Sequence, residues 1–168
     1  MLVIVFGLPG TGKTTFGKML AHRLQGIHLN SDVVRSLMGL RGQYDPHHKA
    51  LVYETLFTET LQALNNGKTV VLDASFHRQA MRQEVIERLT NGQLPLYWIE
   101  LQADDDVIHG RVSHPRPDSE ADFSVFRLMQ AQWEPMHEEH LILHSDQESL
   151  EQMLEKALLY VKKDSYKT

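Results

Sequence analysis

The stretch Gly7-Leu8-Pro9-Gly10-Thr11-Gly12-Lys13-Thr14 decides the fold of this chain. It contains a glycine, any four residues and then Gly-Lys-Thr, which is the pattern of a phosphate-binding loop. Glycines let the backbone curl until successive N–H groups point toward one anion. In this pattern the lysine reaches the β- and γ-phosphates of a nucleoside triphosphate, and the threonine hydroxyl binds Mg²⁺. We therefore predict that Gly7 to Thr15 binds ATP, with Lys13 contacting the phosphates and Thr14 contributing to a Mg²⁺ site.

The residues on either side of the loop support this prediction. The apolar run from Leu2 to Phe6 is typical of a buried parallel strand. After the loop, an apolar residue recurs at every fourth position from Phe16 to Leu24, which indicates a helix. The alternative is a glycine-rich turn that binds no ligand, but such a turn does not require Lys13 and Thr14 together.

Composition sets the broad class of the protein. The chain has 168 residues, of which 42% are hydrophobic, so a single domain with a buried core is expected. The net charge of -5 argues against a nucleic acid as the main partner, since proteins that bind nucleic acids usually carry a basic stripe. The absence of cysteine excludes disulfides and thiolate chemistry. The apolar runs are too short to span a bilayer and the N-terminus has no signal-peptide pattern, so we expect a cytoplasmic protein with no membrane partner. Nothing in the sequence indicates an oligomeric state.

Short apolar runs alternate with helical patterns along the chain, as in an α/β domain with a mostly parallel sheet. Beyond the first strand, we predict strands at Ile27 to Asn30, Thr69 to Asp73, Leu94 to Leu101 and Leu141 to Leu143. Three helix boundaries are also predicted: Ser31 as the cap of the helix after the second strand, a later helix running from Asp122 to Glu134, and Ser145 with Glu148 as a capping box for the last helix. No repeat or linker divides the chain, so we expect one domain over residues 1–168.

Two aspartates follow predicted strands, at the edge of the sheet where ligands of α/β proteins gather. Asp73 ends the third strand, where a carboxylate beside a phosphate loop can hold Mg²⁺; the alternative is an aspartate that only forms a turn. Asp32 follows the second strand and could accept the proton of an attacking hydroxyl. Arg35 lies three residues further on, on the same helix face. The alternative for Asp32 and Arg35 is a solvated ion pair at a helix start.

Arginines near these sites could neutralise charge during phosphoryl transfer. Arg111 and Arg116 flank a proline-rich segment, and we predict that a lid of about residues 112–122 brings one or both of them over the phosphates. The alternative for each is a solvated arginine on a loop. Arg78 is close enough to the third strand to touch a substrate, whereas Arg82 is predicted to be a surface charge. The ten histidines are predicted to be surface or loop residues rather than ligands of a transition metal.

Two further motifs resemble those of the small P-loop kinases. They are Asn-Ser-Asp-x-x-Arg at residues 30–35 and Asp-Ala-Ser-Phe-x-Arg at residues 73–78. The chain is most similar to the kinase domain of polynucleotide kinases and related predicted bacterial ATP-binding kinases. Zeta-toxin, chloramphenicol phosphotransferase and gluconate kinase are more distant relatives.

This resemblance implies a P-loop NTPase fold of three α/β/α layers, with a parallel five-stranded sheet of order 2-3-1-4-5. It implies that Asp32 is the general base, that Arg35 contacts the acceptor or a phosphate next to it, and that Asp73 is the Walker B residue. It also implies lid roles for Arg111 and Arg116, and a place near the adenine for residues 144–146.

The leading hypothesis is therefore an ATP- and Mg²⁺-dependent kinase that transfers the γ-phosphate to a hydroxyl of a small molecule. Two alternatives remain. One is 5′-hydroxyl phosphorylation of a polynucleotide, which the acidic net charge disfavours. The other is a nucleotide-sensing module that binds ATP without an acceptor of its own.

Overall fold

Five parallel strands form the centre of the protein. The computed structural model describes residues 1–90, 94–114 and 121–163. The strands are β1 (Leu2–Phe6), β2 (Ile27–Asn30), β3 (Val70–Asp73), β4 (Leu96–Gln102) and β5 (Leu141–His144). They form one sheet of order β2-β3-β1-β4-β5, and each neighbouring pair is parallel. The predicted strand order and α/β fold class are confirmed.

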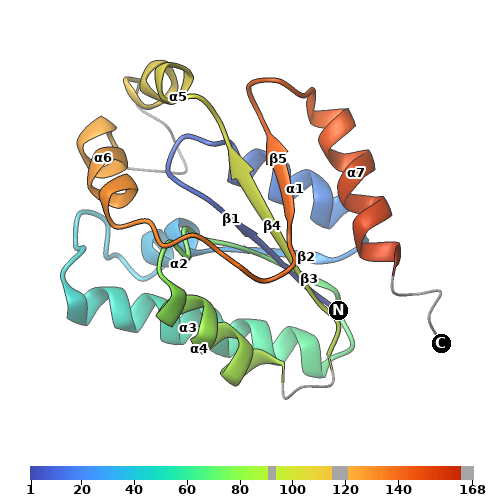
Figure 1. Ribbon diagram of the computed structural model, residues 1–168. Coiled ribbons are helices and arrows are strands. Elements are labelled where there is room, and N and C mark those ends of the chain that lie inside the picture. Colours follow the sequence, from blue (N-terminus) through green and yellow to red (C-terminus); the bar gives the residue numbers. More distant parts are fainter. Residues whose placement is uncertain (91–93, 115–120, 164–168) are drawn as a thin grey trace.

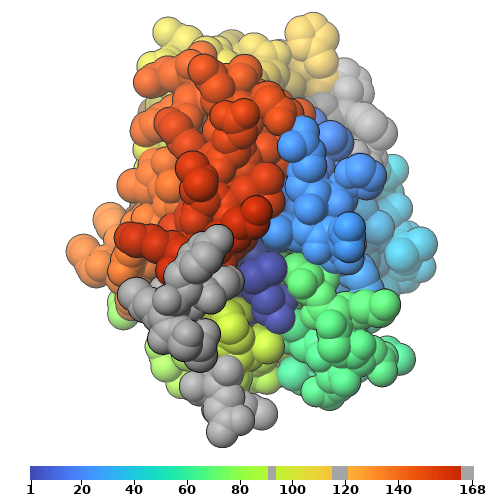
Figure 2. All heavy atoms as spheres, turned by 90° about the vertical axis from the view of Figure 1, so that its right-hand side faces the viewer, coloured from blue at the N-terminus to red at the C-terminus, as the bar shows by residue number. Residues whose placement is uncertain are grey.

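Helices cover both faces of this sheet and give the three layers visible in Figure 1. They are α1 (Lys13–Arg23), α2 (Ser31–Leu37), α3 (Pro46–Asn65), α4 (Gln79–Leu89), α5 (Asp105–Val112), α6 (Phe123–Ala131) and α7 (Leu150–Lys162). Helices α1 and α7 lie beside each other on one face, and α3 and α4 cover the other (Figures 1 and 2). Helices α5 and α6 pack on each other at the carboxyl end of the sheet, around Ile108, Val112 and Phe126.

The alternation of side chains along β1 explains why the sheet is covered on both faces. Leu2, Ile4 and Phe6 point into the core beneath α3 and α4, whereas Val3 and Val5 point into the core beneath α1 and α7. Successive residues of a strand point to opposite faces, so a strand buried on both sides has to be apolar at every position. All five residues of β1 are fully buried, as this rule requires.

Three of the predicted helix boundaries are wrong. The cap of α2 is Asn30, not Ser31, because the Asn30 side chain accepts hydrogen bonds from the next two free N–H groups of the helix. The helix predicted to run to Glu134 ends at Ala131, because the chain beyond it turns so that the Glu134 N–H donates to the carbonyl of His77. The capping box of α7 is Ser149 with Gln152 rather than Ser145 with Glu148.

The fourth strand also begins two residues later than predicted, at Leu96. Among the helices of the described ranges, none is long and apolar enough to cross a membrane.

Candidate functional site

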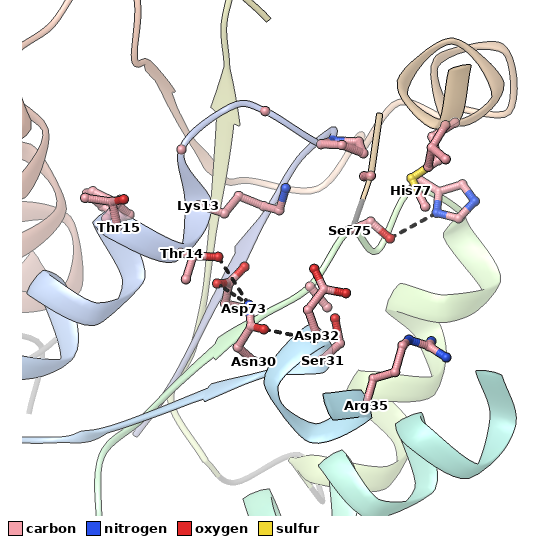
Figure 3. Close-up of a pocket in the computed structure, with 18 of the residues that line it drawn as sticks. Lys13, Thr14, Thr15, Asn30, Ser31, Asp32, Arg35, Asp73, Ser75 and His77 are labelled. Atoms are coloured by element: carbon pink, nitrogen blue, oxygen red, sulfur yellow. Dashed lines mark hydrogen bonds between the residues drawn. The ribbon is translucent and has the colours of Figure 1, made fainter. Parts of the chain in front are cut away.

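A cavity of about 1250 Å³ lies at the carboxyl ends of the strands. Its wall combines the glycine-rich loop, the first turns of α1 and α2, the start of α3, the β3–α4 connection and one side of α6. Figure 3 shows Lys13 and Asp32, which come from different elements, pointing into this cavity. Parallel strands end at the same edge of a sheet, so residues far apart in the sequence meet there.

The loop before α1 depends on its glycines. Gly7, Gly10 and Gly12 have φ angles of 144°, 85° and 90°, which residues with a Cβ rarely adopt. A Cβ on Gly7 would lie 2.3 Å from the carbonyl oxygen of Leu101, so the backbone of β4 passes too close for any other residue. The Lys13 ammonium folds over the loop and donates to the Leu8 carbonyl at 2.8 Å. The loop therefore has the closed curvature that brings backbone N–H groups around an anion.

Asn30 joins the two oxygen-bearing residues predicted to hold Mg²⁺. Its amide nitrogen donates to the Asp73 carboxylate at 2.7 Å and to the Thr14 hydroxyl at 3.3 Å. A carboxylate and a hydroxyl brought together in this way are hard oxygen ligands of the kind that Mg²⁺ prefers. Asp73 is only 1% exposed, and the Nε2 of His28 lies 3.3 Å from the same carboxylate oxygen that Asn30 contacts. The donor set at Thr14 and Asp73 therefore fits a magnesium ion.

The same Asn30 side chain also sets the position of Asp32. Its oxygen accepts hydrogen bonds from the N–H groups of Asp32 and Val33, each at 2.9 Å, and so begins α2. Asp32 occupies the first turn of that helix and lines the cavity. One asparagine thus connects the predicted metal ligands with the predicted base. We did not predict a role for Asn30, although it opens the 30–35 motif.

Arg35 is not the solvated surface residue of the alternative interpretation. Only 5% of it is exposed, its guanidinium donates to the carbonyl of Gln43, and it lies 4.4 Å above the centre of the Tyr44 ring. The loop before α3 is therefore packed around this side chain. Arg35 lines the cavity together with Asp32.

Arg111 lies on α5 and contacts the phosphate-binding loop directly. It donates to the Gly10 carbonyl at 3.2 Å, and to the hydroxyl and carbonyl of Ser145 at 2.8 and 3.0 Å. Ser145 is one of the residues predicted near the adenine, and it also lines the cavity. The second predicted arginine, Arg116, lies outside the described residues, as does most of the predicted lid.

The β3–α4 connection carries side chains that we did not predict. Ser75 and His77 lie within 3.3 Å of each other and line the cavity (Figure 3). Burial, together with the nearby charges of Lys49 and Arg78, lowers the pKa of His77 to about 4, so this imidazole is neutral at pH 7. Tyr53 of α3 also lines the cavity, and burial raises the pKa of its hydroxyl to about 12. The connection therefore offers neutral hydrogen-bonding groups beside the charged ones.

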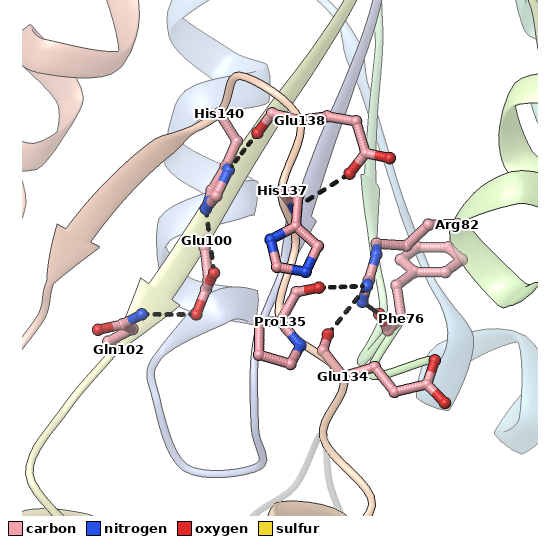
Figure 4. Close-up of polar contacts among 9 residues, drawn as sticks. All are labelled: Phe76, Arg82, Glu100, Gln102, Glu134, Pro135, His137, Glu138 and His140. Carbon is pink, nitrogen blue, oxygen red and sulfur yellow. Dashed lines mark hydrogen bonds and ion pairs between the residues drawn. The ribbon is translucent and has the colours of Figure 1, made fainter. Parts of the chain in front are cut away.

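The prediction that Arg82 is a surface charge is wrong. Its guanidinium is buried and donates to the carbonyls of Phe76, Glu134 and Pro135 at 2.9, 2.9 and 3.2 Å (Figure 4). It thereby ties the β3–α4 connection to the segment that follows α6. Phe76 has a left-handed φ of 40°, so the guanidinium supports a strained turn next to the cavity.

The prediction for the histidines is wrong for His28, which is half-buried in β2 beside Asp73 because this edge strand lies beneath α1. His140 lies in the loop before β5, as predicted, and its Nε2 lies 3.2 Å from Glu100 in a mostly buried pair (Figure 4). Across the described ranges, no group of three or more histidines and carboxylates is arranged to hold a metal ion.

Comparison with known proteins identifies the family. A family model described as an AAA domain, AAA_33, matches residues 2–136. The chain belongs to the AAA_33 family. The family match spans the loop, Asp32, Asp73 and Arg111, and ends before β5 and α7.

Solved structures share the fold of this AAA_33 chain over most of its length. A sugar kinase from Janibacter sp. HTCC2649 superposes with a TM-score of 0.75 at 20% identity, over 96% of this chain and 94% of that one. A gluconokinase from Sinorhizobium meliloti 1021 gives 0.68 at 17% identity, over 96% and 91%. The Pnkp1/Rnl/Hen1 RNA repair complex contains a chain that gives 0.60 at 17% identity, over 79% of this chain and 46% of that one. The predicted P-loop NTPase fold is thereby confirmed.

Proposed function

We propose that this protein is an ATP-dependent kinase that transfers the γ-phosphate to a hydroxyl group of a small molecule. The observation that carries the proposal is that Asp32 and the phosphate-binding loop line one cavity, with Asn30 bonded to both sides of it. A module that only senses ATP has no need for a carboxylate that lines the cavity beside the phosphate-binding loop. We also propose that residues 1–168 act as a single kinase domain.

Each residue has a defined role in this reaction. The loop N–H groups and Lys13 hold the β- and γ-phosphates, and Arg111 adds positive charge beside the loop. Thr14 and Asp73 would hold Mg²⁺, which when bound offsets phosphate charge. Asp32 accepts the proton of the acceptor hydroxyl while the hydroxyl oxygen forms a bond to the γ-phosphorus. At the same time the bond between that phosphorus and the bridging oxygen of ADP breaks. Arg35 orients the acceptor, and we propose that Arg116 closes over the phosphates.

A small-molecule acceptor suits the dimensions of the site. The cavity has the volume of a pocket for ATP together with a compact second substrate. The sugar kinase and the gluconokinase that share the fold are named for small-molecule substrates, which supports this choice. The likeness to a chain of the RNA repair complex makes a 5′-hydroxyl polynucleotide the second candidate.

The test is transfer of γ-phosphate from ATP across sugars, nucleosides, antibiotics and 5′-hydroxyl oligonucleotides, with and without Mg²⁺. Asp32→Asn should lose transfer to the acceptor while it still binds ATP, and Lys13→Ala should lose both. Full transfer by Asp32→Asn would overturn the assignment of the base. Normal turnover by Lys13→Ala would overturn the proposed function.

The two alternatives give different results in the same screen. Transfer only to oligonucleotides, with activity falling steeply as salt rises, would establish a polynucleotide kinase. Tight ATP binding without transfer to any acceptor would establish a sensing module.

A further inference from the structure

Three cations line the acceptor side of the cavity, next to Asp32. They are Arg35 on α2, Lys49 on α3 and Arg78 at the start of α4. They are near enough to repel one another: burial, followed by the charges of Arg78 and Arg35, lowers the pKa of Lys49. Like charges held together in a half-buried space are unfavourable unless an anion joins them.

The protein itself leaves this positive charge largely uncompensated. Across the residues that the structure describes, the Lys49 ammonium has neither a hydrogen-bond acceptor nor an ion-pair partner. Arg78 donates to a neutral oxygen, the side-chain oxygen of Gln132, at 2.7 Å. The Nε of Arg35 is buried and has no hydrogen-bond partner within the described ranges. Glu134, the carboxylate near His77, accepts a hydrogen bond from the first N–H of α4 at 2.6 Å.

Neutral groups surround the cations. Ser75 and the uncharged His77 lie on one side, and Val125, Leu128 and Met129 of α6 form an apolar wall. Hydroxyl and imidazole groups of this kind bind the hydroxyls of a substrate, whereas they cannot balance a charge. On the acceptor side of the pocket, the charge of these three cations therefore lies among groups that otherwise suit a neutral polyhydroxylated molecule.

We infer that the acceptor carries a negative charge of its own, a carboxylate or a phosphate, which Lys49 and Arg78 bind together with Arg35 while Asp32 receives the proton of its hydroxyl. Asp32 repels the same anion, so the hydroxyl and the charged group have to lie on different parts of the acceptor. Lys49 is then a specificity-determining residue that selects charged acceptors over neutral ones. This inference rests on the proposed kinase function.

The experiment compares acceptors that differ only in charge. Transfer from ATP is measured for an aldonate against its aldose, for a sugar phosphate against the free sugar, and for a nucleoside 3′-monophosphate against the nucleoside. We expect the charged member of at least one pair to have the higher kcat/KM by tenfold or more. The carboxylate and phosphate pairs show which anion the site prefers.

Lys49→Met then tests the residue. It should raise the KM of the charged acceptor by about tenfold to a hundredfold, the loss expected for one hydrogen-bonded ion pair, and leave the KM of ATP unchanged. Lys68→Met is the matched control, because Lys68 is exposed and lies two residues before β3, at the end of the sheet opposite the cavity. Circular dichroism and unfolding of both variants establish that they are folded.

The outcomes separate this inference from the function on which it rests. Transfer that is equally efficient for both members of every pair, with no selective effect of Lys49→Met, would overturn the anionic acceptor and leave the kinase intact. Absence of transfer to every acceptor, with normal ATP binding, would overturn the proposed kinase function and with it the inference.

Discussion

The buried guanidinium of Arg82 is expected to be among the most important polar groups for the stability of this protein. It lies on α4 and makes three hydrogen bonds to carbonyls, one of them to the strained turn at Phe76 and two to residues 134–135. Arg82→Met keeps an unbranched side chain about as long as the aliphatic part of arginine and removes every donor. The three carbonyls then lose their partner together.

The size of the effect follows from where these carbonyls lie. The bond to Phe76 is buried, so its loss leaves an unsatisfied oxygen at a cost of about 1–3 kcal/mol. The other two bonds are half-buried, and water can replace part of each, which leaves about 0.5–1.5 kcal/mol per bond. The expected loss in the free energy of unfolding is therefore about 2–6 kcal/mol, which at about 3 °C per kcal/mol is about 6–18 °C in Tm for a chain of this size. Arg82→Lys should lose about half as much, because one ammonium cannot reach all three oxygens.

Urea unfolding followed by circular dichroism measures these differences. The control is Arg88→Met on the same helix, where the arginine forms surface ion pairs with Glu84 and Glu54 that contribute about 1 kcal/mol or less. The reasoning about Arg82 is refuted if Arg82→Met and Arg88→Met are equally stable.

Three further predictions concern the site itself. Asn30→Ala should lower the free energy of unfolding by about 2–4 kcal/mol, since it removes a helix cap and a buried hydrogen bond to Asp73; a loss below about 1 kcal/mol in urea unfolding would contradict the proposed junction. Because the pKa of His77 in the folded protein, about 4, lies below its unfolded value, the wild type should lose stability as pH falls from about 6.5 to 4. His77→Gln should lose less, which unfolding at pH 4.5 and 7 will show, and identical pH profiles would exclude a role for this imidazole. Gly7→Ala should destabilise the protein by about 3 kcal/mol or more and abolish ATP binding in calorimetry, whereas Gly67→Ala, with positive φ but open space around it, should cost only about 1 kcal/mol and retain binding.

The central strands were predictable here because their burial is visible in their residues. The run from Leu2 to Phe6 is apolar throughout and short, and the glycine-rich loop follows it at once, which is typical of a strand covered on both faces. Helix starts were less predictable, because Ser145 and Ser149 are each followed three residues later by a residue suited to a capping box. In the structure, Arg111 donates a hydrogen bond to the hydroxyl of Ser145, which therefore does not cap the helix. A contact between residues 34 positions apart is not visible in a local sequence pattern.

The same limit applies to the arginines and lysines of the site. Arg78 and Arg82 are one helical turn apart and differ little in sequence context, yet one lines the cavity and the other is buried beneath residues 134–135. Their difference arises from the return of the chain after α6, which a helix pattern cannot reveal. The sequence around Lys49 likewise does not distinguish it from other lysines on exposed helix faces. Its position at the cavity with Arg35 is a result of the tertiary fold.

The position of β2 at the edge of the sheet has a consequence for how this protein can diversify. The central strands β1, β3 and β4 each have neighbours on both sides, and their ends carry the phosphate-binding loop and Asp73. Asp32, Arg35 and Lys49 instead lie in the single segment between β2 and β3, which is attached to the sheet through its edge strand. Insertions or exchanges in that segment can reshape the acceptor end without shifting the register of the central strands. A protein built in this way can acquire a new acceptor while it keeps the same ATP.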